Sequence, residues 1–157
     1  MKTAAFILII FFIGVFLSCS HHTANSKSAA IVPFTDSNWV FIPAIVRPQV
    51  GNSTPVNGNY TVSLNSHKLN VYLPYFGRAY DGSDVFSGKN PLDFISTDFT
   101  INQLLKKNGQ EFIIRPNDQP GVQSMDFTFY TGGNANLYIN MFTRSGIGFT
   151  GNARRGK

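Results

Sequence analysis

Between residues 60 and 149, apolar and polar residues alternate along much of the chain with a period of two. The alternating apolar positions fall into five runs: Tyr60, Val62 and Leu64; Leu69, Val71 and Leu73; Met125, Phe127 and Phe129; Leu137, Ile139 and Met141; Ile147 and Phe149. This period is typical of β-strands with one buried and one solvated face. Stretches rich in Gly, Asn and Pro separate the runs, as turns do. The pattern predicts an all-β fold, either an antiparallel β-sandwich or a partly open barrel.

The pattern also predicts how some of the strands are connected. Residues 59–64 and 69–73 should form a hairpin, and the last three runs are joined by such short segments that they predict a C-terminal meander. These runs are 123–131, 135–143 and 147–151. We expect at least six strands within residues 38–151. Residues 100–107 fit both a helix and an extended segment, so at most one short helix is expected.

The N-terminus has a different pattern. Lys2 precedes an unbroken apolar run at residues 4–17, which is the layout of a signal peptide. A helix needs about 20 apolar residues to cross the hydrocarbon core of a bilayer, and this run has 14. We therefore expect residues 1–18 to be a signal peptide. The alternative is a short uncleaved anchor helix.

Residues 16–19, Phe-Leu-Ser-Cys, resemble the lipobox of bacterial lipoproteins, in which lipid is attached to the cysteine. Cys19 is the only cysteine, so lipidation is expected at Cys19 and a disulfide is not. Residues 19–37 are mostly small and polar, as in a flexible tether. The tether should lead to a single β domain at residues 38–152, followed by a basic tail at residues 153–157.

The charge of the chain is mildly basic, with 13 Lys and Arg, 8 Asp and Glu, and a net charge of +5. Apart from Lys106-Lys107 and Arg154-Arg155, the basic residues are scattered, which argues against nucleic-acid binding. The expected partner is a membrane, reached through the N-terminal lipid. The basic tail should be a solvated end, and contact between it and anionic headgroups is the lesser alternative.

The densest aromatic stretch outside the signal peptide is residues 71–80, Val-Tyr-Leu-Pro-Tyr-Phe-Gly-Arg-Ala-Tyr. Pro74 lacks a backbone donor and should end the strand before it. Gly77 permits either a positive φ or a close approach of the backbone to another group. The aromatic residues after the proline are expected to return to the apolar core: Tyr75, Phe76 and Tyr80.

Residues 73–80 match, residue for residue, the hallmark segment of the family called domain of unknown function 4251, small exported lipoproteins common in Bacteroidetes. The chain resembles this family more loosely from about Trp39 to Gly151. The resemblance implies a fold and an exported location, and it implies no activity. Some surface-exposed lipoproteins of that lineage carry acidic residues soon after the cysteine, and residues 20–23 have none. The resemblance therefore implies an outer-membrane anchor that faces the periplasm.

Candidate catalytic chemistry is sparse. His21 and His22 lie in the tether and His67 lies in the expected hairpin turn, so no metal site is expected. Neither a Cys-His nor a Ser-His-Asp arrangement is indicated. The candidate carboxylates for glycoside hydrolysis are not paired by their spacing; they are Asp81, Asp84, Asp93, Asp98, Glu111, Asp118 and Asp126. No phosphate-binding or calcium-binding loop motif appears, so neither a cofactor nor an enzyme is expected.

Three classes of function follow from these observations. The leading one is a non-catalytic envelope module that binds a protein, glycan or lipid. Its candidate binding patch is Tyr75, Arg78 and Tyr80, because aromatic and Arg side chains dominate binding hot spots; a purely structural role is the competing interpretation. The second is a carrier that holds a small apolar ligand in a β cup lined by Phe, and the third is an envelope enzyme acting on glycan. A large internal cavity would favour the carrier, and a packed interior would favour the module.

Overall fold

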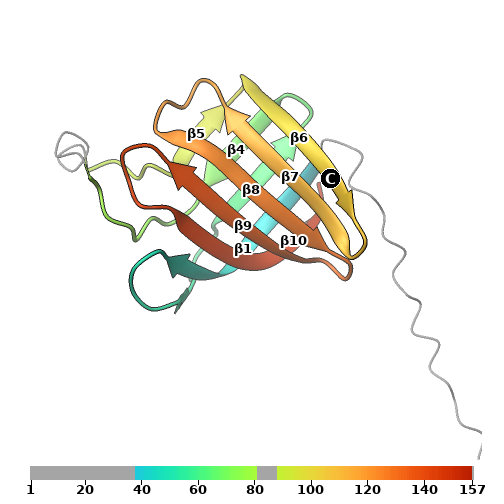
Figure 1. The fold of residues 1–157 in the computed structure, drawn as a ribbon, viewed down its shortest axis with the longest axis horizontal. Helices are drawn as coiled ribbons and strands as arrows, with labels where there is room; N and C mark the ends of the chain where they lie inside the picture. The colour runs from blue at the N-terminus through green and yellow to red at the C-terminus, as the bar shows by residue number, and fades with distance from the viewer. Residues whose placement is uncertain (1–37, 81–87, 157) are drawn as a thin grey trace, which may run out of the picture.

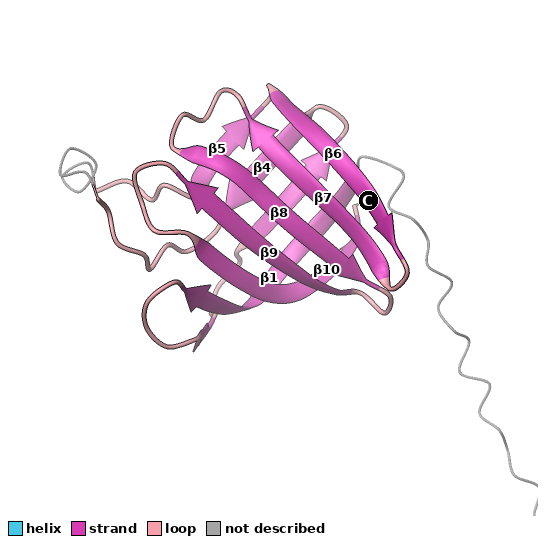
Figure 2. Cartoon of the chain, viewed as in Figure 1, coloured by secondary structure: helices cyan, strands magenta, loops and turns pink. Residues whose placement is uncertain are grey.

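The computed structural model describes residues 38–80 and 88–156. This part of the chain is all-β and contains no helix (Figure 2). Its strands are β1 (Asn38–Pro48), β2 (Thr54–Pro55), β3 (Thr61–Asn65), β4 (Lys68–Tyr72), β5 (Asp93–Ser96), β6 (Phe99–Lys106), β7 (Gly109–Pro116), β8 (Val122–Tyr130), β9 (Asn134–Met141) and β10 (Ile147–Arg155). The predictions of an all-β fold and of at least six strands are confirmed. Residues 100–106, which fitted a helix or a strand, belong to β6.

All the strand pairs are antiparallel and form one sheet, in the order β5-β4-β3-β1-β10-β9-β8-β7-β6, with β2 added beside β1. Its two edge strands, β5 and β6, are consecutive in the chain and are separated only by Thr97 and Asp98. The sheet therefore curls into a nearly closed, barrel-like cup, and Figure 1 shows β6 to β10 in front of β4 and β5. Of the two predicted architectures, the partly open barrel is confirmed.

The predicted hairpin and meander are both present. Thr61 pairs with Tyr72 and Asn65 pairs with Lys68 in the hairpin of β3 and β4. Strands β8, β9 and β10 follow one another in the sheet as predicted. Strand β10, however, continues to Arg155, so residues 153–155 end a strand where a basic tail was expected. A single small inward residue, the buried Ala153, left no visible alternation there.

Bulky inward side chains fill the barrel. The Trp39 ring lies 4.9 Å from the Phe127 ring and 5.1 Å from the Phe129 ring, measured between centroids, and both pairs are edge-on. Trp39 and Phe127 are fully or almost fully buried, as is Phe149 from β10. Aromatic pairs of this geometry contribute about 0.5–1.5 kcal/mol each beyond the area they bury. The alternating apolar residues of the sequence thus form one continuous core.

One carboxylate fastens the place where β5 turns into β6, which we call the carboxylate corner (Thr97, Asp98 and Asp118). The Ser96 hydroxyl donates to Asp118 Oδ1 over 2.5 Å, and the Thr97 amide donates to Asp118 Oδ2 over 2.9 Å. The Asp98 amide lies 3.4 Å from the same Oδ2. The hydrogen bond from Ser96, which has the largest effect, and the one from the Thr97 amide lower the pKa of Asp118 below its ordinary value.

The two ends of the barrel differ in what they contain. The described chain begins and ends at one of them, because Trp39 pairs with Arg155 and the Gly156 amide donates to the Asn38 carbonyl. We call this the tether end. At the opposite end, which we call the groove end, the chain leaves β4 after Tyr72 and leaves β9 after Met141. Figure 1 shows the C-terminus at the right, opposite the loop that follows β9.

Candidate binding site

At the groove end, residues 73–80 lie against the loop of residues 143–145, and we call this contact the aromatic corner. The Tyr80 amide donates to the Thr143 carbonyl, and the Ser145 amide donates to the Arg78 carbonyl, both over 2.8 Å. The Leu73 amide donates to the Leu92 carbonyl over 2.9 Å. Two segments about 70 residues apart in sequence are therefore held together largely through their backbones.

Pro74 follows the last residue of β4, as the sequence predicts, and its side chain is buried. The strand ends there because Pro74 has no amide to donate. A side chain takes part in holding the next turn: Asn90 Nδ2 donates to the Leu73 carbonyl over 2.7 Å. Asn90 Oδ1 also accepts from the Leu92 amide over 3.1 Å, so one amide side chain joins both strand ends.

The hydroxyl of Tyr75 is the centre of the aromatic corner. It lies 2.9 Å from the Ser145 carbonyl and 3.2 Å from the Arg78 carbonyl, so it donates to acceptors on both sides of the contact. The Ser145 hydroxyl in turn accepts from the Arg78 amide over 2.8 Å. The Arg144 guanidinium carbon stands 5.5 Å from the centre of the Tyr75 ring, within range of a cation–π contact. Burial raises the pKa of Tyr75, more than the Ser145 hydrogen bond and the Arg144 charge lower it.

Gly77 lies where its neighbours leave no room for a Cβ atom. A Cβ placed on Gly77 would collide with the Tyr75 hydroxyl and would lie 2.6 Å from Ser145 Oγ, closer than real Cβ contacts. Its φ is outside the positive range found at Gly51, Gly58 and other turn glycines. Of the two sequence-based readings of Gly77, the close approach is therefore confirmed and the positive φ is wrong.

The side chains after Pro74 alternate between the inside and the outside. Tyr75 packs against the core, whereas Phe76 is 58% exposed and Tyr80 is 68% exposed. The expectation that all three aromatic rings return to the core is thus wrong for Phe76 and Tyr80. The extended backbone of this segment sends alternate residues outward, and Arg78 shares the exposed side. The outward residues are therefore Phe76, Arg78 and Tyr80, and Tyr75 supports them from beneath.

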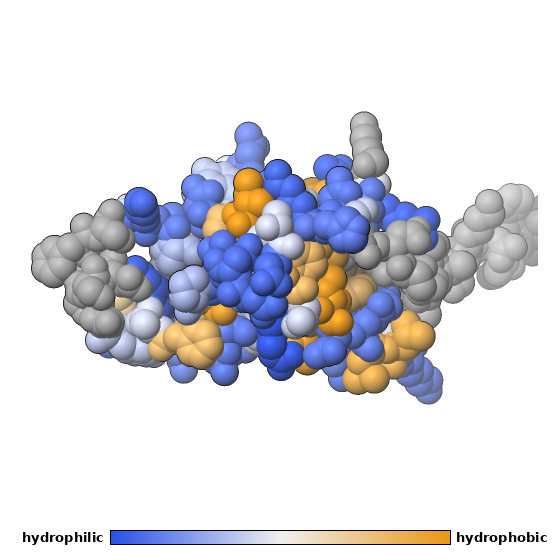
Figure 3. Space-filling view, turned by 90° about the horizontal axis from the view of Figure 1, so that it is seen from above, coloured by the Kyte–Doolittle hydropathy of each residue, from blue (hydrophilic) through white to orange (hydrophobic). Residues whose placement is uncertain are grey.

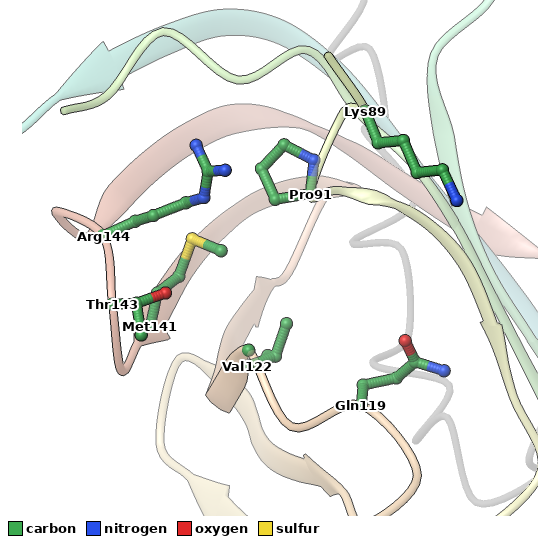
Figure 4. A pocket seen from close by; sticks show the side chains of 8 residues that line it. Lys89, Pro91, Gln119, Val122, Met141, Thr143 and Arg144 are labelled. Atoms are coloured by element: carbon green, nitrogen blue, oxygen red, sulfur yellow. The ribbon is translucent and has the colours of Figure 1, made fainter. Parts of the chain in front are cut away.

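A groove of about 550 Å³ opens beside the aromatic corner. Aromatic rings and prolines form much of its lining, together with two basic residues. These lining residues include Tyr60, Tyr75, Phe76, Pro91, Lys89 and Arg144. A smaller pocket of about 200 Å³ adjoins it and shares Lys89, Pro91 and Arg144. Figure 4 shows Arg144 and Met141 projecting toward Pro91 from one side of this pocket, with Lys89 extending away. We call the larger hollow the mouth groove.

The chemistry of the mouth groove suits recognition of a partner. Its described lining contains Lys89 and Arg144 and no Asp or Glu. Two of the lining residue types, Tyr and Arg, are among those that provide most of the energy at binding interfaces. Sequence reasoning found Tyr75 but missed Arg144, Ser145 and Asn90. Residues 145–146 were taken only as a turn, and no local signal in the sequence could indicate a contact with residues 75–78.

The remaining candidate residues lie apart from this groove. Cys19, His21 and His22 lie outside the described residues, as do Asp81 and Asp84. His67 is exposed in the β3–β4 turn. Each of several described carboxylates has its own neighbour: Asp98 with Asn117, Glu111 with Lys106, Asp118 with Ser96 and Asp126 with Asn140. Within residues 38–80 and 88–156, no three His, Cys, Asp or Glu side chains are grouped to hold a metal.

Within the described part of the chain, no helix is long and apolar enough to cross a membrane. Comparison with known proteins gives a family. The family described as Domain of unknown function (DUF4251) matches residues 23–153. The chain belongs to this family. No curated protein and no solved structure matches it. In this DUF4251 protein, the family match begins 15 positions before β1, well inside the segment that the sequence suggested was only a tether.

Proposed function

We propose that this DUF4251 protein is a non-catalytic module of the bacterial envelope, anchored by lipid at Cys19, which binds a protein or glycan partner through the mouth groove. One structural observation is the main support for this proposal. The described chain starts at the tether end, and the mouth groove opens at the other end of the barrel. An anchor attached before Asn38 therefore joins the barrel at the end opposite the groove.

The reach of the anchor is compatible with this arrangement. Asn38 follows Cys19 by 19 positions, and a chain of that length spans at most about 65 Å when fully extended. The signal-like run at residues 4–17 and the lipobox-like residues 16–19 support export and acylation. The absence of acidic residues at positions 20–23 supports an outer-membrane anchor that faces the periplasm.

The packing of the barrel favours a binding module over a carrier of an apolar ligand. A carrier needs space inside its cup, but side chains such as Trp39, Phe41 and Phe127 occupy the interior and contact one another. The mouth groove and the pocket beside it lie at the groove end of the barrel instead.

Two measurements test the two halves of the proposal. Labelled fatty acid should be incorporated into the wild-type protein and not into Cys19→Ser, which should also accumulate unprocessed. For the groove, a photocrosslinking amino acid at Phe76 should give a discrete adduct in intact cells. The same probe at Tyr138, 40% exposed on β9, is the control. Absence of fatty-acid label from the wild type would refute the anchor, and equal adducts at both positions would refute the groove.

A further inference from the structure

The tether end has a group of basic side chains that lie far from the mouth groove and take no part in it. Lys106 and Lys107 stand at the β6–β7 turn, and Arg154 and Arg155 stand at the end of β10. Lys107, Arg154 and Arg155 are exposed, and Lys106 forms an ion pair with Glu111. We call these four basic residues the basic rim.

Backbone hydrogen bonds bring the two halves of the basic rim together. The Thr131 amide donates to the Asn108 carbonyl over 3.3 Å, which joins the turn after β6 to the turn after β8. The Ala153 amide donates to the Gly133 carbonyl over 2.8 Å, which joins the turn after β8 to the end of β10. The four basic residues therefore border one end of the barrel, the end at which the described chain begins.

Two leucines are exposed beside the basic rim. Leu104 is 57% exposed and Leu105 is 67% exposed, and they precede Lys106 on β6. Their side chains point to opposite faces because successive residues of a strand alternate. Both are exposed because β6 is an edge strand of the sheet. Figure 3 shows hydrophobic surface toward the right of the view, where Figure 1 places the β6–β7 hairpin.

The charge at the tether end is mainly positive. Glu111 is the carboxylate near the basic rim within the described chain, and it is already paired with Lys106. Basic side chains next to exposed large apolar ones are the composition of surfaces that lie on anionic bilayers, where the apolar groups enter the headgroup region. An isolated protein partner is a poorer match, because the proposed anchor joins the chain at this end.

We propose that the basic rim, together with Leu104 and Leu105, is the face that this protein lays against an anionic phospholipid bilayer. The lipid at Cys19 brings the face to the membrane, so the orientation rests on the proposed anchor. The face itself rests on charge and exposure at the tether end. Contact there orients the barrel and presents the mouth groove outward, which a lipid on a long tether does not do by itself.

The test uses the full lipidated protein in vesicles. Because the single native cysteine carries the lipid, Leu105→Cys gives one site for an environment-sensitive fluorophore. Tyr80→Cys is the matched control at the groove end, since Tyr80 is 68% exposed and Leu105 is 67% exposed. In vesicles of phosphatidylcholine with phosphatidylglycerol, the label at 105 should shift to the blue and be quenched by brominated lipid. The label at 80 should do neither, and both should stay unchanged in pure phosphatidylcholine.

Charge variants then test the basic rim. Each basic residue close to an anionic surface favours contact by about fivefold, so Arg154→Gln with Arg155→Gln should reduce the membrane-contacting fraction about 25-fold relative to the free fraction. The double change Arg47→Gln with Arg115→Gln removes the same charge elsewhere and should have little effect. Raising the salt to 1 M, where the screening length is about 3 Å, should also abolish the response at 105.

The outcomes separate this proposal from the anchor. The unsubstituted chain is passed through the labelling step as a blank, and uptake of fluorophore there reports a free Cys19 thiol and failure of the anchor. An intact anchor with equal responses at 105 and 80 would overturn the membrane face. A response at 105 that depends on protein concentration and not on anionic lipid would also overturn it, and would identify the edge of β6 as a contact between two copies of the chain.

Discussion

The aromatic corner and the carboxylate corner have the same structural role but use different chemistry. Each joins distant segments where the chain leaves a strand. The aromatic corner uses neutral hydroxyls, Tyr75 and Ser145, which exchange hydrogen bonds with backbone groups in a partly buried site. The carboxylate corner uses the charged Asp118 at the surface, which accepts from Ser96 and Thr97. The first should therefore depend on steric fit and be insensitive to pH, and the second should depend on ionisation.

The largest expected effect is that of Gly77→Val at the aromatic corner. Any Cβ at this position meets the Tyr75 hydroxyl and Ser145 Oγ, so the two segments must separate or the tyrosine must leave its site. Overpacking of this kind costs about 1–3 kcal/mol. Thermal unfolding followed by circular dichroism should show the loss.

Gly121→Val is the matched control for Gly77→Val, because a Cβ there has no heavy atom within 4 Å and its φ is not in the positive range. It should melt close to the wild type. If the two valine variants melted together, the tight contact at Gly77 would not be limiting and the aromatic corner would be able to open at little cost.

Tyr75→Phe should have the next largest effect, because it removes the hydroxyl and keeps the ring. The Ser145 carbonyl loses its donor in a partly buried site, which costs about 1 kcal/mol. The loss measured by urea unfolding should be the same at pH 5 and pH 8, since the raised pKa of Tyr75 keeps its hydroxyl protonated at both. Tyr72→Phe, on the exposed outer face of β4, is the comparison and should be close to neutral.

These corners also show where sequence reasoning succeeds and where it stops. The period-two pattern is a local property, so the hairpin, the meander and the inward residues Leu64, Phe127 and Ile139 followed from it. The closure of the sheet through Ser96 and Asp118 did not, because the partners are 22 positions apart and neither residue type is distinctive. Phe76 and Tyr80 were misplaced because aromatic content was given more weight than the alternation of the extended segment that holds them.

At the carboxylate corner, Asp118→Asn should be less destabilising and should depend on pH. The pKa of Asp118 is lowered in the folded protein, so its ionised form contributes stability above the unfolded pKa of about 3.9. That contribution is lost as the pH falls through the lower, folded pKa. The difference in Tm between wild type and Asp118→Asn should therefore be constant from pH 7 to about pH 5 and shrink toward pH 2.

Asp93→Asn, an exposed carboxylate on β5, serves as the control for Asp118→Asn. Its melting temperature should follow that of the wild type over the whole pH series. A difference between wild type and Asp118→Asn that persisted unchanged at pH 2 would show that the carboxylate corner depends on shape, as the aromatic corner does, and the contrast between the two would fail.

The smallest expected effect is that of Arg78→Ala at the aromatic corner. Arg78 contributes its amide, which donates to Ser145 Oγ over 2.8 Å, and its carbonyl, which accepts from the Ser145 amide over 2.8 Å. Arg78→Ala keeps both groups and removes only an exposed side chain, so the free energy of unfolding should stay within about 0.5 kcal/mol of the wild type. Ser145→Ala keeps the backbone bonds but leaves the Arg78 amide without its hydroxyl acceptor, so it should be the more destabilising of the two. Chemical denaturation of both variants decides the matter. Should Arg78→Ala unfold first, the guanidinium would be a structural group, and the exposed face of the corner would lose its positive charge as a means of recognition.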